Sequence, residues 1–119
     1  MTKNNLVQQK CFAFSLMIIE LYIQLKAERE YVISTQLLKC GTSIGANIEE
    51  AIAGQSRKDF IHKMSISSKE ARETRYWLKL LQESNLSTID VSLYLSEIEQ
   101  IISILTSIVK TSQNRIQNS

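Results

Sequence analysis

The chain has 119 residues, of which 44% are hydrophobic, and a formal net charge of +2. A single domain of this length can bury a hydrophobic core, and the hydrophobic content excludes wholesale disorder. The net charge is too small to indicate nucleic-acid binding by itself. Proline is absent and glycine occurs three times. Because proline breaks helix interiors, this composition favours a chain that is almost entirely helical.

The first predicted helix covers about residues 5–30 and has two apolar faces. One face has helical spacing and is assigned to the core: Val7, Cys11, Phe14, Ile18, Leu21 and Leu25. The other face carries Phe12, Leu16, Ile19 and Ile23. A helix with two apolar faces needs two surfaces to bury against. We expect the second surface to belong to a neighbouring subunit.

The same segment bears on localisation. The apolar run 12–23 is interrupted by Glu20 and lacks a small-residue cleavage site. It is also shorter than the roughly 20 apolar residues of a transmembrane helix. We therefore expect a cytoplasmic protein without membrane contact, in which Cys11 and Cys40 are reduced and buried as small hydrophobic side chains.

The second predicted helix covers about residues 34–53, with Ser34 as its N-cap. Its inner stripe comprises Leu37, Gly41, Ile44, Ile48, Ala51 and Ile52. Gly41 and Gly45 lie inside this helix, where each glycine costs about 1 kcal/mol relative to alanine. The usual compensation is the close approach of another helix, and we expect that role here.

Gly54 ends the second helix, and Ser56 with Asp59 has the spacing of a capping box at the start of the third, at about residues 57–83. The expected inner face of the third helix is Phe60, Met64, Ser67, Ala71, Thr74, Leu78 and Leu81, bordered by Trp77.

The fourth helix is predicted at about residues 88–112, with Ser87 and Asp90 as a second capping box. Its inner face is Val91, Tyr94, Leu95, Ile98, Ile101, Ile102, Leu105, Ile108 and Val109. Residues 113–119 are polar and expected to fray. Short connections between long helices predict antiparallel neighbours. The whole chain, 1–119, is thus predicted to be one all-α domain, an antiparallel up-down-up-down four-helix bundle.

The third helix has an unusual charge pattern, since residues 57–79 include seven basic and three acidic residues, a net charge of +4. A helical wheel places most of the basic residues on one outer sector: Arg57, Lys58, Lys69, Arg72, Arg75 and Lys79. The acidic residues fall on the other flank, and Lys63 is expected to pair with Asp59, as Lys69 is with Glu73. Three interpretations of the basic sector remain open: a solvated face, a subunit interface and a phosphate-binding surface.

No catalytic, metal or cofactor site is predicted, and we expect a protein that is not an enzyme. A di-iron bundle needs two Glu-x-x-His motifs, but His62 is the only histidine. No phosphate-binding glycine loop is present, and no serine or cysteine has a credible histidine partner. His62 is interpreted as a surface or structural residue.

Residues 43–51 read SIGANIEEA, followed by Ser56, by Asp59-Phe60, and by Lys69-Glu70-Ala71 with Glu73. This pattern resembles the four-helix-bundle proteins encoded within intervening sequences of bacterial 23S ribosomal RNA genes. That family is similar to the accessory variability protein of diversity-generating retroelements. The resemblance spans nearly the whole chain and is strongest from Ser43 to Leu81.

The resemblance implies a ring-shaped homo-oligomer, typically a pentamer, without enzymatic activity. In the retroelement relatives a basic barrel binds nucleic acid and a reverse transcriptase, so RNA or a nucleic-acid enzyme is the implied partner here. The expected function is binding of structured RNA or a ribonucleoprotein, and the alternative is a protein–protein scaffold. By similarity, the RNA-contacting candidates are Arg57, Lys58, Lys69, Arg72, Arg75 and Lys79. Structural or interface roles are expected for Ser43, Gly45, Asn47, Glu50, Asp59 and Phe60.

Overall fold

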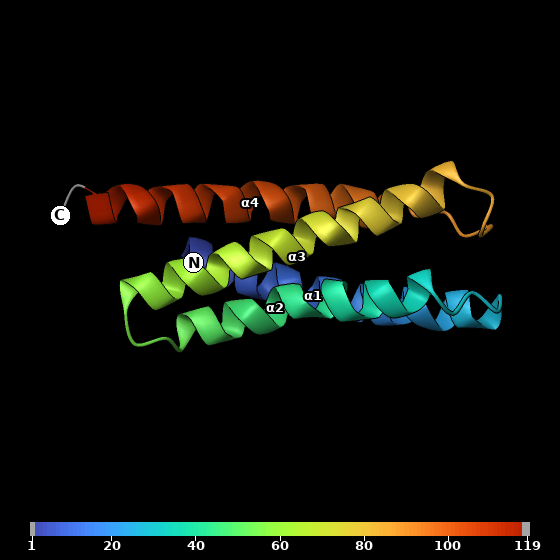
Figure 1. Cartoon of the computed structure of the whole chain (residues 1–119), viewed down its shortest axis with the longest axis horizontal. Helices are drawn as coiled ribbons and strands as arrows, with labels where there is room; N and C mark the ends of the chain where they lie inside the picture. Colours follow the sequence, from blue (N-terminus) through green and yellow to red (C-terminus); the bar gives the residue numbers. More distant parts are fainter. Residues whose placement is uncertain (1, 118–119) are drawn as a thin grey trace.

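A computed structural model describes residues 2–117, apart from the side chain of Lys3. It contains four α-helices within that range: α1 (Lys3–Ala27), α2 (Ile33–Ile52), α3 (Arg57–Glu83) and α4 (Ser92–Gln117). Each helix packs on the next along the chain, and α4 packs on α1, which closes the bundle. The result is an elongated body of 52 × 25 × 23 Å with up-down-up-down topology, as predicted (Figure 1). The α1–α2 side of the bundle is therefore opposite its α3–α4 side.

The core is built from the inner stripes that the sequence predicts. Its largest fully buried side chains include Phe14, Ile18, Leu21, Leu37, Met64, Leu78 and Leu105. Ile52 is an exception, because its side chain is 43% exposed near the end of α2 rather than part of the inner stripe. Cys11 and Cys40 are free and buried, as expected. Burial raises the pKa of the Cys11 thiol to about 12 and that of the Cys40 thiol to about 11.

Both glycines inside α2 face α1. A Cβ atom added at Gly41 would lie 2.9 Å from the Ile18 side chain, and one added at Gly45 would lie 3.5 Å from the Cys11 carbonyl oxygen. The Gly41 contact confirms that this glycine allows α1 to approach closely, whereas a Cβ at Gly45 would make only ordinary van der Waals contacts. The absence of a side chain at Gly41 lets the β-branched Ile18 fill the space instead.

The turn between α1 and α2 differs from the prediction. The first helix ends at Ala27, not at residue 30, because Arg29 takes a left-handed conformation with φ of 64°. Ser34 is not the N-cap of α2. Instead the Glu30 carboxylate accepts the N–H groups of Val32, Ile33 and Ser34 at 3.0, 2.9 and 2.7 Å. Glu30 therefore satisfies the unpaired amides of the first turn, and Ser34 lies inside the helix.

The start of α4 also corrects the prediction. The helix begins at Ser92 rather than near residue 88, and Asp90 accepts the Ser92 amide at 2.9 Å. Ser87 does not cap this helix, because its hydroxyl donates to Glu28 at 2.7 Å, while Thr88 donates to the same carboxylate at 2.8 Å. These two bonds tie the α3–α4 connection to the end of α1. At its other end α4 continues to Gln117, so residues 113–117 are helical rather than frayed, while 118–119 lie outside the described residues.

Both chain ends and the α2–α3 connection lie at one end of the bundle, whereas the α1–α2 and α3–α4 connections lie at the other (Figure 1). The α2–α3 connection ends at Ser56, whose hydroxyl accepts the Asp59 amide at 3.1 Å. This serine is the N-cap of α3, as the capping-box spacing predicts.

Candidate nucleic-acid interface

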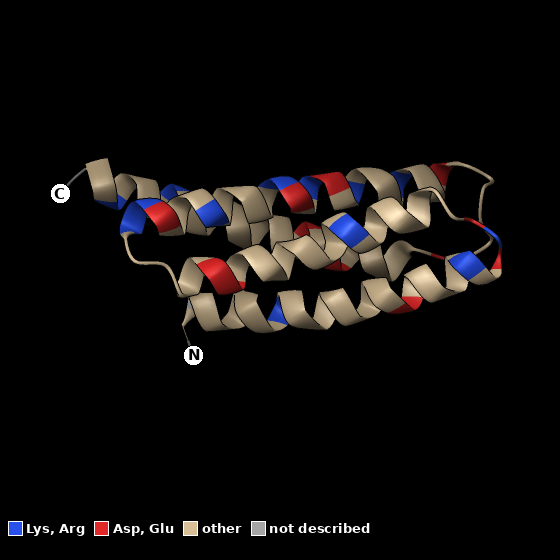
Figure 2. Cartoon of the chain, turned by 60° about the horizontal axis from the view of Figure 1, so that its bottom comes forward, with Lys and Arg blue, Asp and Glu red and all other residues tan. Residues whose placement is uncertain are grey.

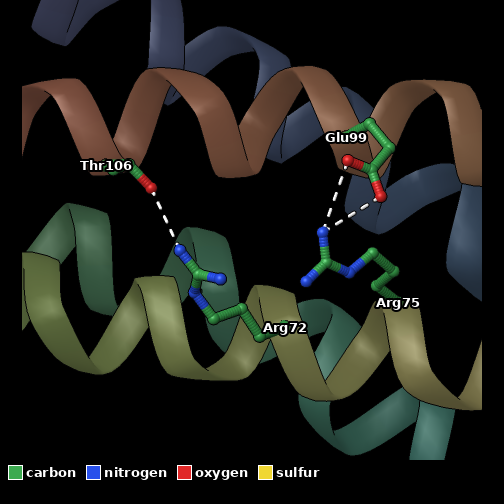
Figure 3. A network of polar contacts seen from close by, with 4 residues as sticks. All are labelled: Arg72, Arg75, Glu99 and Thr106. Atoms are coloured by element: carbon green, nitrogen blue, oxygen red, sulfur yellow. Dashed lines mark hydrogen bonds and ion pairs between the residues drawn. The ribbon is translucent and has the colours of Figure 1, made fainter.

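The six basic residues predicted to contact RNA do not share one environment. Arg72 and Arg75 point toward α4, as Figure 3 shows. Arg75 Nη1 lies 3.1 and 3.3 Å from the two carboxylate oxygens of Glu99, and Arg72 Nη2 donates to the Thr106 hydroxyl at 3.3 Å. Arg75 is therefore an electrostatically compensated, half-buried residue of the α3–α4 seam. Arg72 remains exposed and keeps most of its guanidinium donors available.

The other four basic residues are exposed, and Lys69 lies near the Glu70 carboxylate. Arg57, Lys58, Lys69 and Lys79 take no part in the three ion pairs among the described residues. They extend over most of the length of α3. The structure thus divides the predicted set into five side chains that can meet an external anion and one, Arg75, that is already paired.

The acidic flank of α3 faces α2. Glu73 accepts the indole N–H of Trp77 at 3.1 Å, and Glu70 lies near Lys39 of α2. Partial burial raises the pKa of Glu70, and the neighbouring Glu73 carboxylate adds to that rise. Glu70 and Glu73 are therefore held on the side of α3 that is turned away from α4.

Two expected ion pairs within α3 are replaced by other contacts. Lys63 pairs with Glu50 of α2 at 3.0 Å, not with Asp59, and Lys69 and Glu73 form no ion pair among the described residues. Lys63 pairs with Glu50 rather than with Asp59 because Glu50 and Lys63 lie opposite each other across the α2–α3 contact. Glu50 thus has a structural role between helices.

The remaining motif residues occupy local structural positions. Ser43 donates to the Lys39 carbonyl at 2.6 Å, and the Asn47 amide donates to the Ser43 carbonyl at 2.8 Å, both within α2. Phe60 is half-buried and packs against the core. These contacts lie within the chain, and an interface role for Ser43, Gly45, Asn47, Asp59 and Phe60 remains a prediction.

The structure also identifies residues that sequence reasoning missed. A hollow of about 280 Å³ lies between α3 and α4 and is lined by Ser65, Ser68, Arg72, Thr106, Val109, Lys110 and Gln113. Of its α4 residues, Val109 was assigned to the inner face, whereas Thr106, Lys110 and Gln113 were assigned no functional role. The available signal was that α4 has no acidic residue after Glu99 but does contain Lys110 and Arg115.

An apolar stripe runs along the outer side of α1. Phe12, Leu16, Ile19 and Ile23 are 66, 54, 39 and 61% exposed. Phe12, Leu16 and Ile19 form one wall of a groove of about 320 Å³, whose other wall includes Thr42, Gly45 and Ala46 of α2. No charged residue occurs in α1 between Lys10 and Glu20, and Figure 2 shows how little charge this helix carries compared with α3. The stripe is the apolar face assigned above to a neighbouring subunit.

Two helices, Asn4–Ala27 and Ser92–Gln117, are long and apolar enough to cross a membrane by length and composition. Core helices of a bundle meet the same criterion, and each of these two packs one apolar side into the core. Within residues 2–117 no group of three His, Cys, Asp or Glu side chains is placed to hold a metal ion.

The described residues define the class as an all-α four-helix bundle, with an exposed apolar stripe on α1. A family model described as 23S rRNA-intervening sequence protein matches residues 3–107, and the chain belongs to this family. The assignment agrees with the resemblance seen in residues 43–51. The family's function is uncharacterised.

The fold is shared with a solved relative. A crystal structure of a protein with unknown function from the S23 ribosomal protein family of Bacteroides thetaiotaomicron VPI-5482 superposes with a TM-score of 0.84. The two sequences are 40% identical, and the match covers 92% of this chain and 99% of that one. Comparison with curated proteins gave no match.

Proposed function

We propose that this protein is a non-enzymatic, self-assembling helical protein that binds structured RNA or a ribonucleoprotein through α3. The observation that carries the proposal is the row of exposed basic side chains on α3 that form no ion pair among the described residues. Such side chains contact phosphate groups without reading sequence. The family's description, 23S rRNA-intervening sequence protein, is consistent with an RNA partner.

Self-assembly supports this role because several copies would multiply a modest positive field. The exposed stripe on α1 is the surface we assign to contact between copies, with the groove against α2 receiving part of the neighbouring copy. A ring, with five members by the family resemblance, leaves the α3–α4 side of each bundle free. That side is opposite the α1–α2 side in every copy.

RNA binding is tested by fluorescence anisotropy with a labelled RNA stem-loop at increasing salt. The variant Lys58→Gln/Lys69→Gln removes two outward charges of α3. The matched control, Lys26→Gln/Lys39→Gln, removes the same charge from exposed positions on α1 and α2. We expect the α3 variant to weaken binding by about tenfold at low salt and the control to change it little. If both variants weaken binding equally, the affinity depends only on the net charge of the protein, and a specific RNA-binding surface on α3 is contradicted.

Self-assembly is tested by light scattering of the purified protein. Phe12→Glu should dissociate the oligomer, because it places a charge in the apolar stripe. Leu93→Glu is the matched control, since Leu93 is 63% exposed on α4, outside the stripe. A wild-type monomer would contradict self-assembly.

The second candidate function is a protein–protein scaffold without nucleic-acid contact, which the uncovered apolar stripe of α1 favours. This alternative predicts a stable oligomer whose anisotropy assay shows no RNA binding even at low salt.

A further inference from the structure

We propose that the seam between the N-terminal half of α3 and the C-terminal half of α4 is the track that holds the phosphate backbone of the bound RNA. The inference deepens the proposed RNA binding, on which it rests. It adds a groove shared with α4 to the phosphate contacts of the outward face of α3.

One hollow lies on the side of this seam, and a second lies at the end of the bundle. The side hollow, of about 280 Å³, contains Arg72 and Lys110. The end hollow, of about 540 Å³, lies where the seam reaches the end of the bundle and contains Arg57 and Arg115. On α4 the first is lined by Thr106, Val109, Lys110 and Gln113, and the second by Ile108, Thr111, Ser112 and Arg115. The two sets are offset by two residues, about 200° around the helix, so the hollows overlap in position along α4 but lie on opposite flanks of it.

No acidic residue lines either hollow. The α4 helix has none from Gln100 to Gln117, and the Glu70 and Glu73 carboxylates of α3 are held on the α2 side. The four cations therefore have no acidic side chain among the residues that line the two hollows, while the Asp59 side chain lies beside Gly54 at the edge of the end hollow. Solvent and salt screen the electrostatic effect of more distant acidic residues on the seam. The excess of basic side chains that line the hollows therefore favours an anionic ligand.

The uncharged lining of the seam also fits phosphate oxygens. Hydroxyl and amide groups are common phosphate contacts beside Arg and Lys. The side hollow has Ser65, Ser68, Thr106 and Gln113, and the end hollow has Asn4, Gln55, Ser56, Thr111 and Ser112. The Thr106 hydroxyl accepts a hydrogen bond from Arg72 at 3.3 Å, which holds the guanidinium over the seam.

The length of the seam favours a polyanion over a small anionic ligand. Arg57 and Arg72 are separated by about 22 Å along α3, at about 1.5 Å per residue. One phosphate group cannot contact both, whereas a nucleic-acid strand presents phosphates at repeated intervals. The seam is on the α3–α4 side of the bundle, opposite the proposed contact between copies, so both surfaces can be occupied together.

The test uses the full chain and the same labelled RNA stem-loop. Lys110→Gln/Arg115→Gln removes the two basic side chains of α4, neither of which takes part in an ion pair among the described residues. Lys58→Gln/Lys69→Gln is the outward-face variant, and Lys26→Gln/Lys39→Gln is the charge-matched control. Circular dichroism and light scattering establish that each variant keeps its fold and its oligomeric state.

We expect the α4 variant to weaken binding by about tenfold and to reduce the slope of log affinity against log salt by about one to two. If the outward-face variant weakens binding but the α4 variant behaves like the control, RNA binding stands and the seam is overturned. If the wild-type protein does not bind the stem-loop at low salt, both proposals are overturned.

Discussion

Gly41 of α2 lies directly against Ile18 of α1: a Cβ added at Gly41 would be 2.9 Å from each γ-carbon of Ile18. Real Cβ atoms do not approach other heavy atoms so closely, and Ile18 is fully buried. We predict that Gly41→Ala lowers the free energy of unfolding by about 1 kcal/mol. Overpacking costs about 1–3 kcal/mol, which exceeds the helix-propensity gain of about 1 kcal/mol.

Gly45→Ala is the matched control for that substitution. A Cβ at Gly45 would make ordinary contacts, with the nearest atom 3.5 Å away, so we expect stability to be unchanged or to rise by up to about 1 kcal/mol. Urea unfolding measures both variants. Because Gly45 lines the groove beside α1, the comparison is repeated in the Phe12→Glu background. Equal changes for the two substitutions would contradict close packing as the reason for Gly41.

The Glu30 cap predicts a second stability effect. Glu30→Ala leaves three amides at the start of α2 without their carboxylate acceptor, and we expect a loss of about 2 kcal/mol in the free energy of unfolding. Glu30→Gln should lose less because it keeps an amide oxygen in place. Glu83→Ala, at an exposed position that takes part in no ion pair among the described residues, should stay within about 0.5 kcal/mol of wild type. A Glu30→Ala variant as stable as Glu83→Ala would show that solvent replaces the cap without cost.

The Glu28 carboxylate makes stability depend on pH in the acid range. Hydrogen bonds from the Ser87 and Thr88 hydroxyls lower its pKa below the ordinary value of 4.5. A lowered pKa in the folded state means that the contribution is fully present above pH 4.5 and is lost as pH falls through the folded-state pKa. We therefore expect Glu28→Gln to be less stable than wild type at pH 7 and the difference to shrink below pH 4. Thermal unfolding at a series of pH values measures the stability difference between Glu28→Gln and wild type. A stability difference that does not change with pH would show that the effect does not come from the carboxylate charge.

The two thiols should be unreactive in the folded protein. Since the pKa of Cys40 is raised from 9.0 to about 11, the thiolate fraction at neutral pH falls about a hundredfold, and that of Cys11 falls further. Modification by a dithionitrobenzoate reagent should thus be slow in buffer and fast in guanidinium chloride. Rapid reaction of either thiol in buffer would indicate that the bundle opens locally around it.

The pairing of Arg75 with Glu99 predicts a difference between basic residues of the same helix. Arg75→Gln should reduce RNA affinity less than Lys69→Gln, because the Arg75 guanidinium is already neutralised by its partner. Anisotropy titrations with the labelled stem-loop compare the two. An equal or larger effect of Arg75→Gln would require the ion pair to open when RNA binds.

Helical periodicity was sufficient to predict the fold. Each inner stripe requires a matching surface, and four long stripes joined by short connections can be buried together in an up-down-up-down bundle. The boundaries near residues 30 and 88 were harder to predict. The α2 cap comes from Glu30, beyond a left-handed Arg29, and Ser87 bonds to Glu28 on another helix. Local spacing rules cannot identify either arrangement.

The candidate site could be predicted only in part, for a similar reason. The basic residues of α3 are visible as a pattern, but their partners Glu50, Glu99 and Thr106 are on other helices. The seam joins residues 65–72 to residues 106–113, so its acid-free lining exists only after the chain has folded. The exposed stripe of α1 could be predicted because a second apolar face is a property of a single helix.

The two chain ends lie at the same end of the bundle as the α2–α3 connection and the start of α3 (Figure 1), and α3 begins at Arg57. Any affinity tag or fluorescent fusion, at either terminus, would therefore sit next to the end hollow. A histidine tag there could compete for phosphate or shield the arginines. Proteins for the RNA measurements should carry a removable tag, while a label in the α1–α2 turn would leave the seam unobstructed.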